Sequence, residues 1–410
     1  MASILDDRAD RPQEVMETVQ MEAGNEIMPL QRNEARLLEI ISRGFRGGAV
    51  SFDVILQDGS EHRIGTGSPG FKLRMTHPRG LRAIASFDEG VIANAYIDGW
   101  YEVEGDIIEM FDLRDKVQDR HLFRWLWRFI APVLLGQVRV NKSAISRHYE
   151  RDHSFYLSFL DEEFRCYTQG IFESDDEPLS VAIRRKMDFI LERCKMKPGD
   201  EVLDVGVGWG SFAEHAARKG IKVTGLTIAR QSLSFMQQLT TEKDLPITTS
   251  LTDVLEYKPQ KQFDAIAILG VMEHLPNYDE VLKCFDRLLK PGGHVFLDAS
   301  AIPRKYELSS FITQHIYPGN HSFFVLHDFL KSLASMPFEL KGVWDDRHSY
   351  YLTFVHWAKR FDANRDFIIE HFGGADYRRF RLYLWGAANC FLRNRLQCYR
   401  LVLQKTAVPA

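Results

Sequence analysis

The pattern of apolar and polar positions changes near residue 180 of the 410-residue chain. From there on, apolar runs of strand length alternate with segments whose apolar residues recur at helical spacing. The expected strands are 201–205, 221–227, a short one ending at 248–251, 263–269 and 294–298; the expected helices are 180–195, 210–219, one from 231, and 278–289. This alternation predicts an α/β fold with a doubly wound parallel sheet.

Residues 36–115 follow a different pattern. Period-two alternation in 47–56 and 61–64 flanks a Gln-Asp-Gly-Ser turn, which predicts a hairpin, and 71–75 alternates again. We therefore expect a flexible or loosely docked tail over 1–35, a small α+β domain over 36–115, a linker helix over 116–145, and a larger domain over 146–410. Within the larger domain, the aromatic-rich stretch 304–340 is expected to form a cap.

The longest apolar stretch, 122–140, contains three arginines, so it is too short and too charged to span a bilayer. It suits either a helix packed between two domains or a helix lying on a membrane surface. The net charge of −4 gives no general attraction to nucleic acid. Five scattered cysteines and an N-terminal segment without an apolar core indicate a reducing, cytoplasmic location.

Residues 202–210 carry the clearest chemical signal. A buried strand runs into Gly206, Gly208 and Gly210, and a helix follows, so the backbone can approach a ligand that side chains would block. Ligands of such sheets bind beyond the carboxyl ends of the strands. Thr227, Asp253, the segment 270–274 and Asp298 all follow strands there, in company with Gly206.

Several further motifs accompany this glycine turn along residues 40–405: His148-Tyr149, Gly225-Leu-Thr-Ile, Gly270-Val-Met-Glu-His, Leu289-Lys-Pro-Gly-Gly, and Tyr350 with Thr353 and Trp357. With them the chain resembles the cyclopropane-fatty-acid synthase family of S-adenosylmethionine (SAM)-dependent methyltransferases. The resemblance implies a class I methyltransferase fold with a helical acyl-binding cap and SAM as cofactor. The reaction it implies is C-methylation of the cis double bond of a phospholipid acyl chain, giving a cyclopropane or a methyl- or methylene-branched chain.

The resemblance also implies which residues contact SAM. They are Tyr149, Asp204, Gly206, Gly208, Gly210, Thr227, Gln231, Asp253 and His274. Most methyltransferases place an acid at the end of the second strand to hold the ribose hydroxyls. Here Thr227 occupies that position, and a threonine there is typical of the family. Asp253 is placed to accept from the adenine amino group, and it equally suits a helix N-cap.

The family builds its base site around bicarbonate held by a Cys, a Glu, a His and a Tyr. Glu273 and Tyr350 match, whereas Gln169 and Asp298 replace the Cys and the His. A second carboxylate would repel bicarbonate, so its use is doubtful. In the family, methyl transfer leaves a cation on the acyl chain, and a base then removes a proton from it. We expect Asp298 or Glu273 to act as that base, or the cation to give a methyl- or methylene-branched chain instead of a ring. The alternative is that Gln169 and Asp298 hydrogen-bond to each other and the family reaction continues.

The substrate implied is a phospholipid at the inner face of the membrane, with the protein bound peripherally as a possible homodimer and without nucleic acid. Segment 377–400 pairs aromatic residues with arginines, which suits anionic head groups, although 396–403 also reads as a last strand. Two other functions stay open: a small-molecule amine N-methyltransferase, or a non-catalytic protein that binds lipid or SAM.

Overall fold

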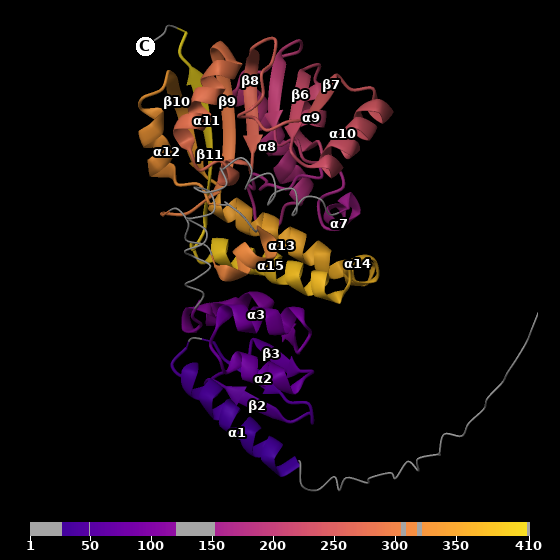
Figure 1. Cartoon of the computed structure of the whole chain (residues 1–410), viewed down its shortest axis with the longest axis vertical. Helices are drawn as coiled ribbons and strands as arrows, with labels where there is room; N and C mark the ends of the chain where they lie inside the picture. The colour runs from indigo at the N-terminus through magenta and orange to yellow at the C-terminus, as the bar shows by residue number, and fades with distance from the viewer. Residues whose placement is uncertain (1–26, 49, 120–151, 305–308, 318–321, 408–410) are drawn as a thin grey trace, which may run out of the picture.

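The computed structural model describes residues 27–48, 50–119, 152–304, 309–317 and 322–407 (Figure 1). The expected linker helix is therefore described only up to residue 119, and the apolar stretch 122–140 and Tyr149 lie outside the described residues. Helix α1 begins at Ile27, so the segment expected to be a tail as far as residue 35 is already helical in its last part.

The N-terminal part is built on a four-stranded sheet of order β2-β1-β3-β4. The predicted hairpin is confirmed, because β1 and β2 pair antiparallel with Phe52 opposite Ile64. The elements are α1 (Ile27–Gly44), β1 (Phe52–Ile55), β2 (Glu61–Ile64), β3 (Phe71–Met75), α2 (Pro78–Ile84), α3 (Glu89–Ile97), β4 (Tyr101–Gly105), α4 (Ile107–Met110) and η1 (Phe111–Lys116). Helix α3 starts at an Asp88 cap, whose side chain accepts from the Val91 amide.

The C-terminal part contains a seven-stranded sheet of order β10-β11-β9-β8-β5-β6-β7. Strands β5 to β9 are parallel, and β11 runs antiparallel to both β9 and β10. Its strands are β5 (Glu201–Val205), β6 (Lys222–Thr227), β7 (Ile247–Leu251), β8 (Phe263–Leu269), β9 (Leu289–Ala301), β10 (Phe338–Asp345) and β11 (Gln397–Lys405). The predicted α/β sheet and the five expected strands are confirmed, although β9 is longer than expected and the antiparallel β11 makes the sheet mixed rather than wholly parallel.

Helices cover both faces of this sheet, as the run of apolar strands requires. Alternate residues of β5 face opposite ways: Val202 joins the core under α8, whereas Leu203 joins the core under α11. The helices are α7 (His153–Leu157), α8 (Leu179–Arg193), α9 (Ser211–Arg218), α10 (Arg230–Lys243), η2 (Met272–His274), α11 (Tyr278–Leu288), η3 (Ile312–Ile316) and α12 (Leu326–Leu333).

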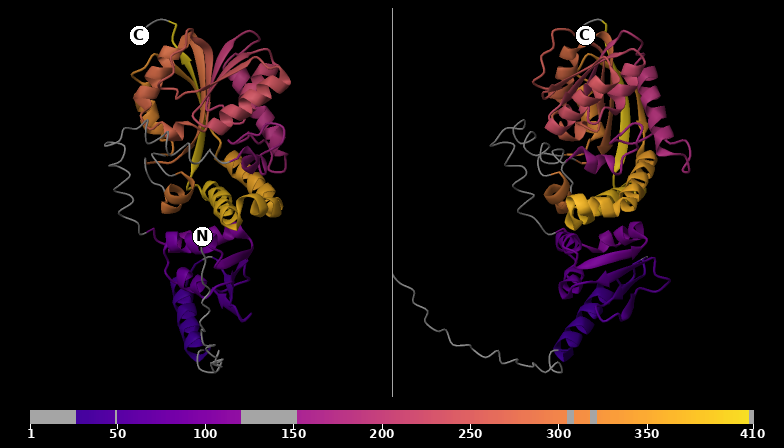
Figure 2. Two further views of the ribbon diagram at one scale, coloured as in Figure 1. Left: turned by 45° about the vertical axis from the view of Figure 1, so that its right-hand side comes forward. Right: turned by 90° about the vertical axis from the view of Figure 1, so that its right-hand side faces the viewer.

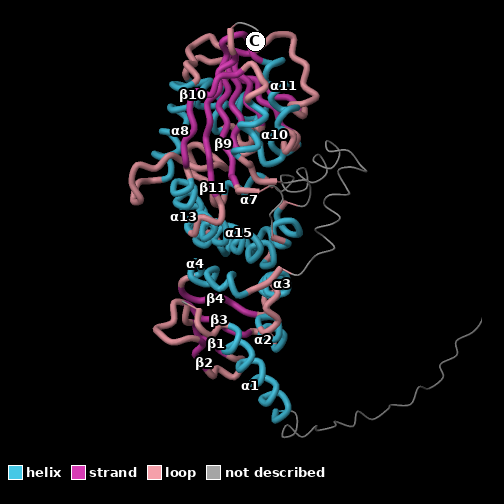
Figure 3. Tube along the Cα trace, turned by 90° about the vertical axis from the view of Figure 1, so that its left-hand side faces the viewer, coloured by secondary structure: helices cyan, strands magenta, loops and turns pink. Residues whose placement is uncertain are grey.

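Three helices between β10 and β11 form a layer beside the carboxyl ends of the parallel strands. They are α13 (Arg347–Ala363), α14 (Arg365–Phe372) and α15 (Gly374–Leu392). Figures 1 and 2 show this layer between the seven-stranded sheet and the N-terminal part. Figure 3 shows α3 and α4 facing α15 from the other side, and both contact it. The layer therefore has one side toward the ligand edge of the sheet and the other toward the N-terminal part.

The expected cap over 304–340 corresponds only in part to the structure. Ser309, Phe311, Ile312, Tyr317 and Phe323 line a cavity, as a cap would. Phe324 and Phe329, in contrast, are fully buried in the core between the sheet and α11, and Phe338 already begins β10. The prediction is only partly right because some aromatic residues of this stretch line the cavity, whereas others pack in the core of the sheet.

Candidate active site

The glycine turn lies between β5 and α9 and uses left-handed backbone angles. Gly206, Gly208 and Gly210 have φ values of 79°, 52° and 79°. A Cβ on Gly206 would lie 2.4 Å from Val271 Cγ2, and one on Gly210 would lie 2.7 Å from Met236 Sδ. A side chain at either position would therefore push away a segment that packs against the turn.

A cavity of about 160 Å³ opens at this turn. Of the residues predicted to contact SAM, those lining it are Asp204, Gly206, Gly208, Thr227, Asp253 and His274. Gly210 and Gln231 do not line it; Gly210 instead starts α9 and approaches α10.

Sequence reasoning missed several residues of this wall, among them Trp209 and Ser232. The Ser232 hydroxyl donates to the Gly208 carbonyl at 2.7 Å and so fixes the glycine turn. The available signal was its place in the first turn of the helix after β6, directly beside Gln231.

Two carboxyl groups, Asp204 and Asp253, belong to the polar part of this smaller cavity, together with hydroxyl side chains and Arg165. Burial raises the pKa of Asp204 to about 7, partly offset by the Ala213 amide. Asp253 Oδ1 accepts from the Leu255 amide at 2.9 Å within a turn, and no helix lies between β7 and β8, so the N-cap alternative is wrong while Asp253 keeps its place in the cavity wall. Burial lowers the pKa of His274 to about 4, so its ring is neutral near pH 7. A glycine-edged cavity with two carboxyls fits SAM, which carries cationic sulfonium and ammonium groups.

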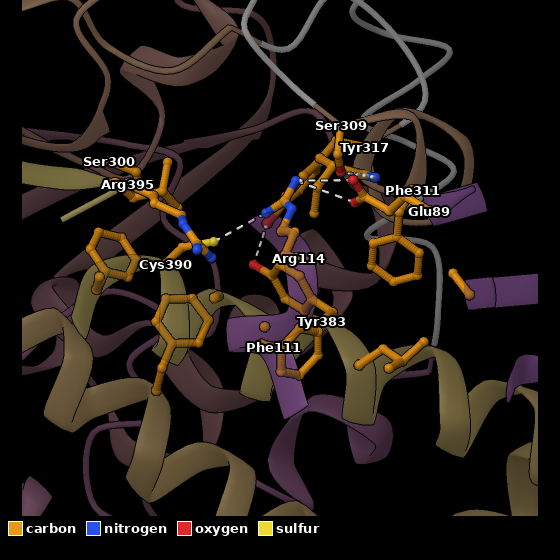
Figure 4. A pocket seen from close by; sticks show the side chains of 18 of the residues that line it. Glu89, Phe111, Arg114, Ser300, Ser309, Phe311, Tyr317, Tyr383, Cys390 and Arg395 are labelled. Atoms are coloured by element: carbon orange, nitrogen blue, oxygen red, sulfur yellow. Dashed lines mark hydrogen bonds and ion pairs between the residues drawn. The ribbon is translucent and has the colours of Figure 1, made fainter. Parts of the chain in front are cut away.

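A larger cavity of about 400 Å³ lies between the ligand edge of the sheet, α13, α15 and the N-terminal part (Figure 4). Its wall is mainly aromatic and aliphatic. The N-terminal part contributes Phe45, Leu73, Ile92, Tyr101, Phe111 and Leu113 to it. This contribution could not be predicted from the sequence, because the hydrophobic pattern of 36–115 is explained equally well by a core of its own.

The two cavities share three wall residues: Tyr167, Gly270 and His274. Glu273 and Tyr350 line the larger cavity. Tyr350 stacks on Phe391 with ring centroids 4.6 Å apart, and burial raises its pKa well above the usual value, so it stays a neutral phenol. The shared wall brings a ligand of the smaller cavity next to a ligand of the larger one.

Glu273 is held firmly but keeps one oxygen unengaged. Its Oε1 accepts from the Ser300 amide at 2.7 Å, and its backbone carbonyl accepts from the Ser322 amide at 2.9 Å. Its Oε2 is buried and has no hydrogen-bond partner among the described residues. Burial raises the pKa of Glu273 to about 7. A buried carboxyl of this kind is suited to accept a proton near neutral pH.

Asp298 occupies a different environment, and the structure does not support its predicted role as a base. Its Oδ2 lies 2.5 Å from Lys186 Nζ, and both side chains are almost completely buried. Its Oδ1 accepts from the Gly270 amide at 2.9 Å, and Lys186 also donates to Thr168 Oγ1 at 2.6 Å. Asp298 lines neither cavity. Its carboxylate therefore neutralises a buried ammonium group and anchors the start of the 270–274 segment.

Gln169 also lies behind the cavity wall. Its Nε2 donates to Asp346 Oδ2 at 3.2 Å, so the expected hydrogen bond to Asp298 is replaced by one to another carboxyl. Asp346 in turn lies 3.5 Å from the Arg400 guanidinium. Lys186, Asp298, Gln169, Asp346 and Arg400 are called the buried polar cluster below.

Bicarbonate does not fit these residues. Of the four positions that the family uses, only Glu273 and Tyr350 face the larger cavity, while Gln169 and Asp298 have other partners. Of the two other family positions, Trp357 lines the cavity, whereas Thr353 Oγ1 accepts from the Gly170 amide at 3.0 Å.

Within the described part of the chain, no helix has the length and apolar character needed to cross a membrane.

The chain is similar to several known lipid-modifying proteins. It is 28% identical over 356 residues to cyclopropane-fatty-acyl-phospholipid synthase of Escherichia coli K12, covering 83% of this chain and 89% of that protein. It is 25% identical over 335 residues to sphingolipid C9-methyltransferase of Candida albicans, covering 76% of this chain but only 64% of that protein. The chain thus spans somewhat less than two thirds of the sphingolipid C9-methyltransferase.

Solved structures give the same picture of the fold. Mycolic acid cyclopropane synthase CmaA1, complexed with SAH and CTAB, has a TM-score of 0.60 at 25% identity, covering 64% of this chain and 98% of that one. Coclaurine N-methyltransferase has a TM-score of 0.64 at 18% identity, covering 77% and 99%, which concerns the fold alone. These similarities confirm the predicted class I SAM-methyltransferase fold, with SAM as the cofactor.

The model of the family described as mycolic acid cyclopropane synthetase matches residues 137–401, which include the glycine turn, the shared wall and Glu273. The predicted family and enzyme class are confirmed: the chain belongs to the cyclopropane synthase family of SAM-dependent methyltransferases.

Proposed function

We propose that this protein transfers the methyl group of SAM to the cis double bond of an unsaturated phospholipid acyl chain at the membrane surface. The observation that carries the proposal is the wall shared by the two cavities. Tyr167, Gly270 and His274 face both the acidic SAM-type cavity and the apolar one, with Glu273 beside them. An acyl chain in the larger cavity would present its double bond at that wall.

The residues of the chain have distinct tasks in such a reaction. SAM supplies an already activated methyl group, so the protein mainly orients the reactants and excludes water. The glycine turn, Asp204 and Asp253 hold the cofactor, and the apolar wall keeps the acyl chain dry. Methyl transfer leaves a cation on the acyl chain. Glu273 Oε2 then accepts a proton, either from the new methyl group to close a ring or from a neighbouring carbon to give a branched unsaturated chain.

The names of the relatives support a lipid substrate, since they include both a phospholipid cyclopropane synthase and sphingolipid methyltransferases. The alternative of amine N-methylation has a similar fold in its favour. The size and apolar wall of the larger cavity favour a lipid. Peripheral binding at the inner face of the membrane is part of the same proposal, and the homodimer stays a prediction.

The test is to incubate the purified full chain with methyl-deuterated SAM and vesicles of dioleoyl phospholipid, then to analyse the fatty acids by mass spectrometry. A product with one added carbon, two deuteriums and resistance to mild hydrogenation is a ring. A labelled chain that still hydrogenates is a branched unsaturated product. Unlabelled lipid in this incubation, together with methyl transfer to small amines offered in a parallel one, would replace lipid methylation by the amine alternative.

A further inference from the structure

The larger cavity carries two permanent cations in its otherwise mainly apolar wall. Among the described residues that line it, these are Arg114 on η1 and Arg395 just after α15. They come from opposite sides of the boundary between the N-terminal and C-terminal parts. Figure 4 shows their guanidinium groups on either side of the Cys390 thiol. An acyl chain cannot form hydrogen bonds or ion pairs with guanidinium groups. These two groups therefore indicate that the ligand has a second, polar part.

The two arginines converge on Cys390. Arg114 Nη1 lies 3.4 Å from Cys390 Sγ, and Figure 4 shows the Arg395 guanidinium on the other side of that thiol. Burial raises the pKa of the Cys390 thiol, and the positive charges of Arg114 and Arg395 partly offset this rise. A small anion beside Cys390 would therefore meet two guanidinium groups.

The acidic partners leave a positive balance in the cavity. Arg114 pairs with Glu89 at 3.2 Å, with side chains 34% and 21% exposed, and Glu89 also lines the cavity. Arg395 pairs with Asp115 at 2.7 Å, but the Asp115 side chain is 76% exposed and does not line the cavity. Water and salt screen an exposed carboxylate strongly. Glu273 also lines the cavity with a pKa raised to about 7, so two guanidiniums face the Glu89 carboxylate and a carboxyl that is only partly ionised near neutral pH.

Phosphate is the group that this arrangement matches best. Guanidinium presents two parallel N–H donors with the spacing of two phosphate oxygens, and its charge does not change with pH. We propose that Arg114 and Arg395 form a subsite for the anionic phosphodiester of the lipid substrate, while its acyl chain extends along the apolar wall toward Glu273. This inference rests on the proposed function and deepens it, because it selects a phospholipid over a neutral lipid.

The competing explanation is that these arginines only tie the two parts of the chain together. A neighbouring ion pair provides the matched control. Arg393 pairs with Asp112 across the same boundary, its Nε lying 2.9 Å from Asp112 Oδ1, yet Arg393 does not line the cavity. Arg393→Gln and Arg395→Gln each remove one positive charge and one tie, but only the second changes the cavity.

The experiment measures methyl transfer by the full chain in nonionic mixed micelles at fixed salt. The substrates are dioleoyl phosphatidylglycerol, dioleoylglycerol and oleic acid. We expect the wild type to prefer the phospholipid to dioleoylglycerol by about tenfold in kcat/KM, and Arg395→Gln to abolish that preference through KM. Arg393→Gln should keep it. Persistence of the preference in Arg395→Gln, or its equal loss in Arg393→Gln, would overturn the subsite.

Two further measurements distinguish a phosphate subsite from a carboxylate subsite, and distinguish failure of the subsite from failure of the proposed function. If oleic acid replaces the phospholipid as the preferred substrate and Arg395→Gln removes that preference, the phosphodiester assignment is overturned in favour of a carboxylate. Thermal unfolding with dodecyl phosphate or dodecyl maltoside needs no turnover. Dodecyl phosphate should raise the Tm of the wild type more than that of Arg395→Gln. A phosphate-specific Tm rise without lipid methylation would reject the proposed function and retain the subsite.

Discussion

Glu273 and Asp298 are two buried carboxyls held by the same strand, yet they lie in regions with opposite properties. Glu273 faces the larger cavity with one oxygen unengaged, and burial raises its pKa to about 7. Asp298 belongs to the buried polar cluster, where Lys186 and the Gly270 amide engage its two oxygens. A carboxyl at the ligand edge of this sheet is therefore available to accept a proton only when no buried cation neutralises it.

The largest expected effect comes from Glu273→Gln, which keeps the shape of the side chain but removes the base. We expect the rate of product formation to fall about 10²- to 10⁴-fold. SAM affinity, measured by calorimetry, should stay close to wild type because Glu273 does not line the smaller cavity. A variant that kept more than a tenth of the wild-type rate would show that Glu273 and Asp298 do not differ as described.

The second prediction concerns the buried ion pair. Lys186→Met leaves the Asp298 carboxylate without its ammonium partner, which should lower the free energy of unfolding by about 3–5 kcal/mol. The double variant Lys186→Met/Asp298→Asn removes both charges and keeps an acceptor for the Gly270 amide, so it should recover most of that stability. Urea unfolding followed by circular dichroism measures both. Equal losses in the single and double variants would contradict the pairing.

The third prediction is the pH dependence of the reaction. The base must be deprotonated to accept a proton, and its pKa is about 7, so the rate should rise with pH through that value and level off above it. One unit below the pKa, the rate should be about tenfold lower than the plateau. Asp204 also has a pKa raised to about 7, so SAM affinity must be measured at each pH. His274, with a pKa of about 4, stays neutral over this range.

The smallest effect is expected for Gln169, at the position where the family has a cysteine. Gln169→Leu removes one hydrogen bond to Asp346 and should lower the free energy of unfolding by about 1–3 kcal/mol. The rate at saturating substrate should change by less than about threefold, because the side chain lines neither cavity. A large fall in rate with unchanged stability would contradict this and would show that Gln169 takes part in the reaction.

Much of the fold could be predicted because its signals are local. Strand β5, the glycine turn and α9 are adjacent in sequence, and the carboxyl ends of parallel strands meet at one edge. The neighbours of Asp298 could not be predicted in the same way. Lys186 lies on α8, which precedes the whole sheet, and nothing in its helical pattern distinguishes a buried lysine from a solvated one.

The larger cavity was the hardest to predict, since its wall comes from both parts of the chain. Phe111 and Phe311 are far apart in sequence, yet both line this cavity, which forms where α15 packs against α3 and α4. The stretch 304–340 was predicted as one cap because its aromatic residues look alike in sequence. Their division between the cavity and the core depends on where α12 and β10 begin.

The shared wall has a consequence for redesigning the enzyme. Tyr167, Gly270 and His274 belong to both cavities, so a substitution made there to accept a different lipid would also reshape the cofactor site. Phe111 and Phe311 line only the larger cavity. Substrate range can therefore be evolved at these distant positions without disturbing the donor, whereas the shared wall constrains both ligands at once.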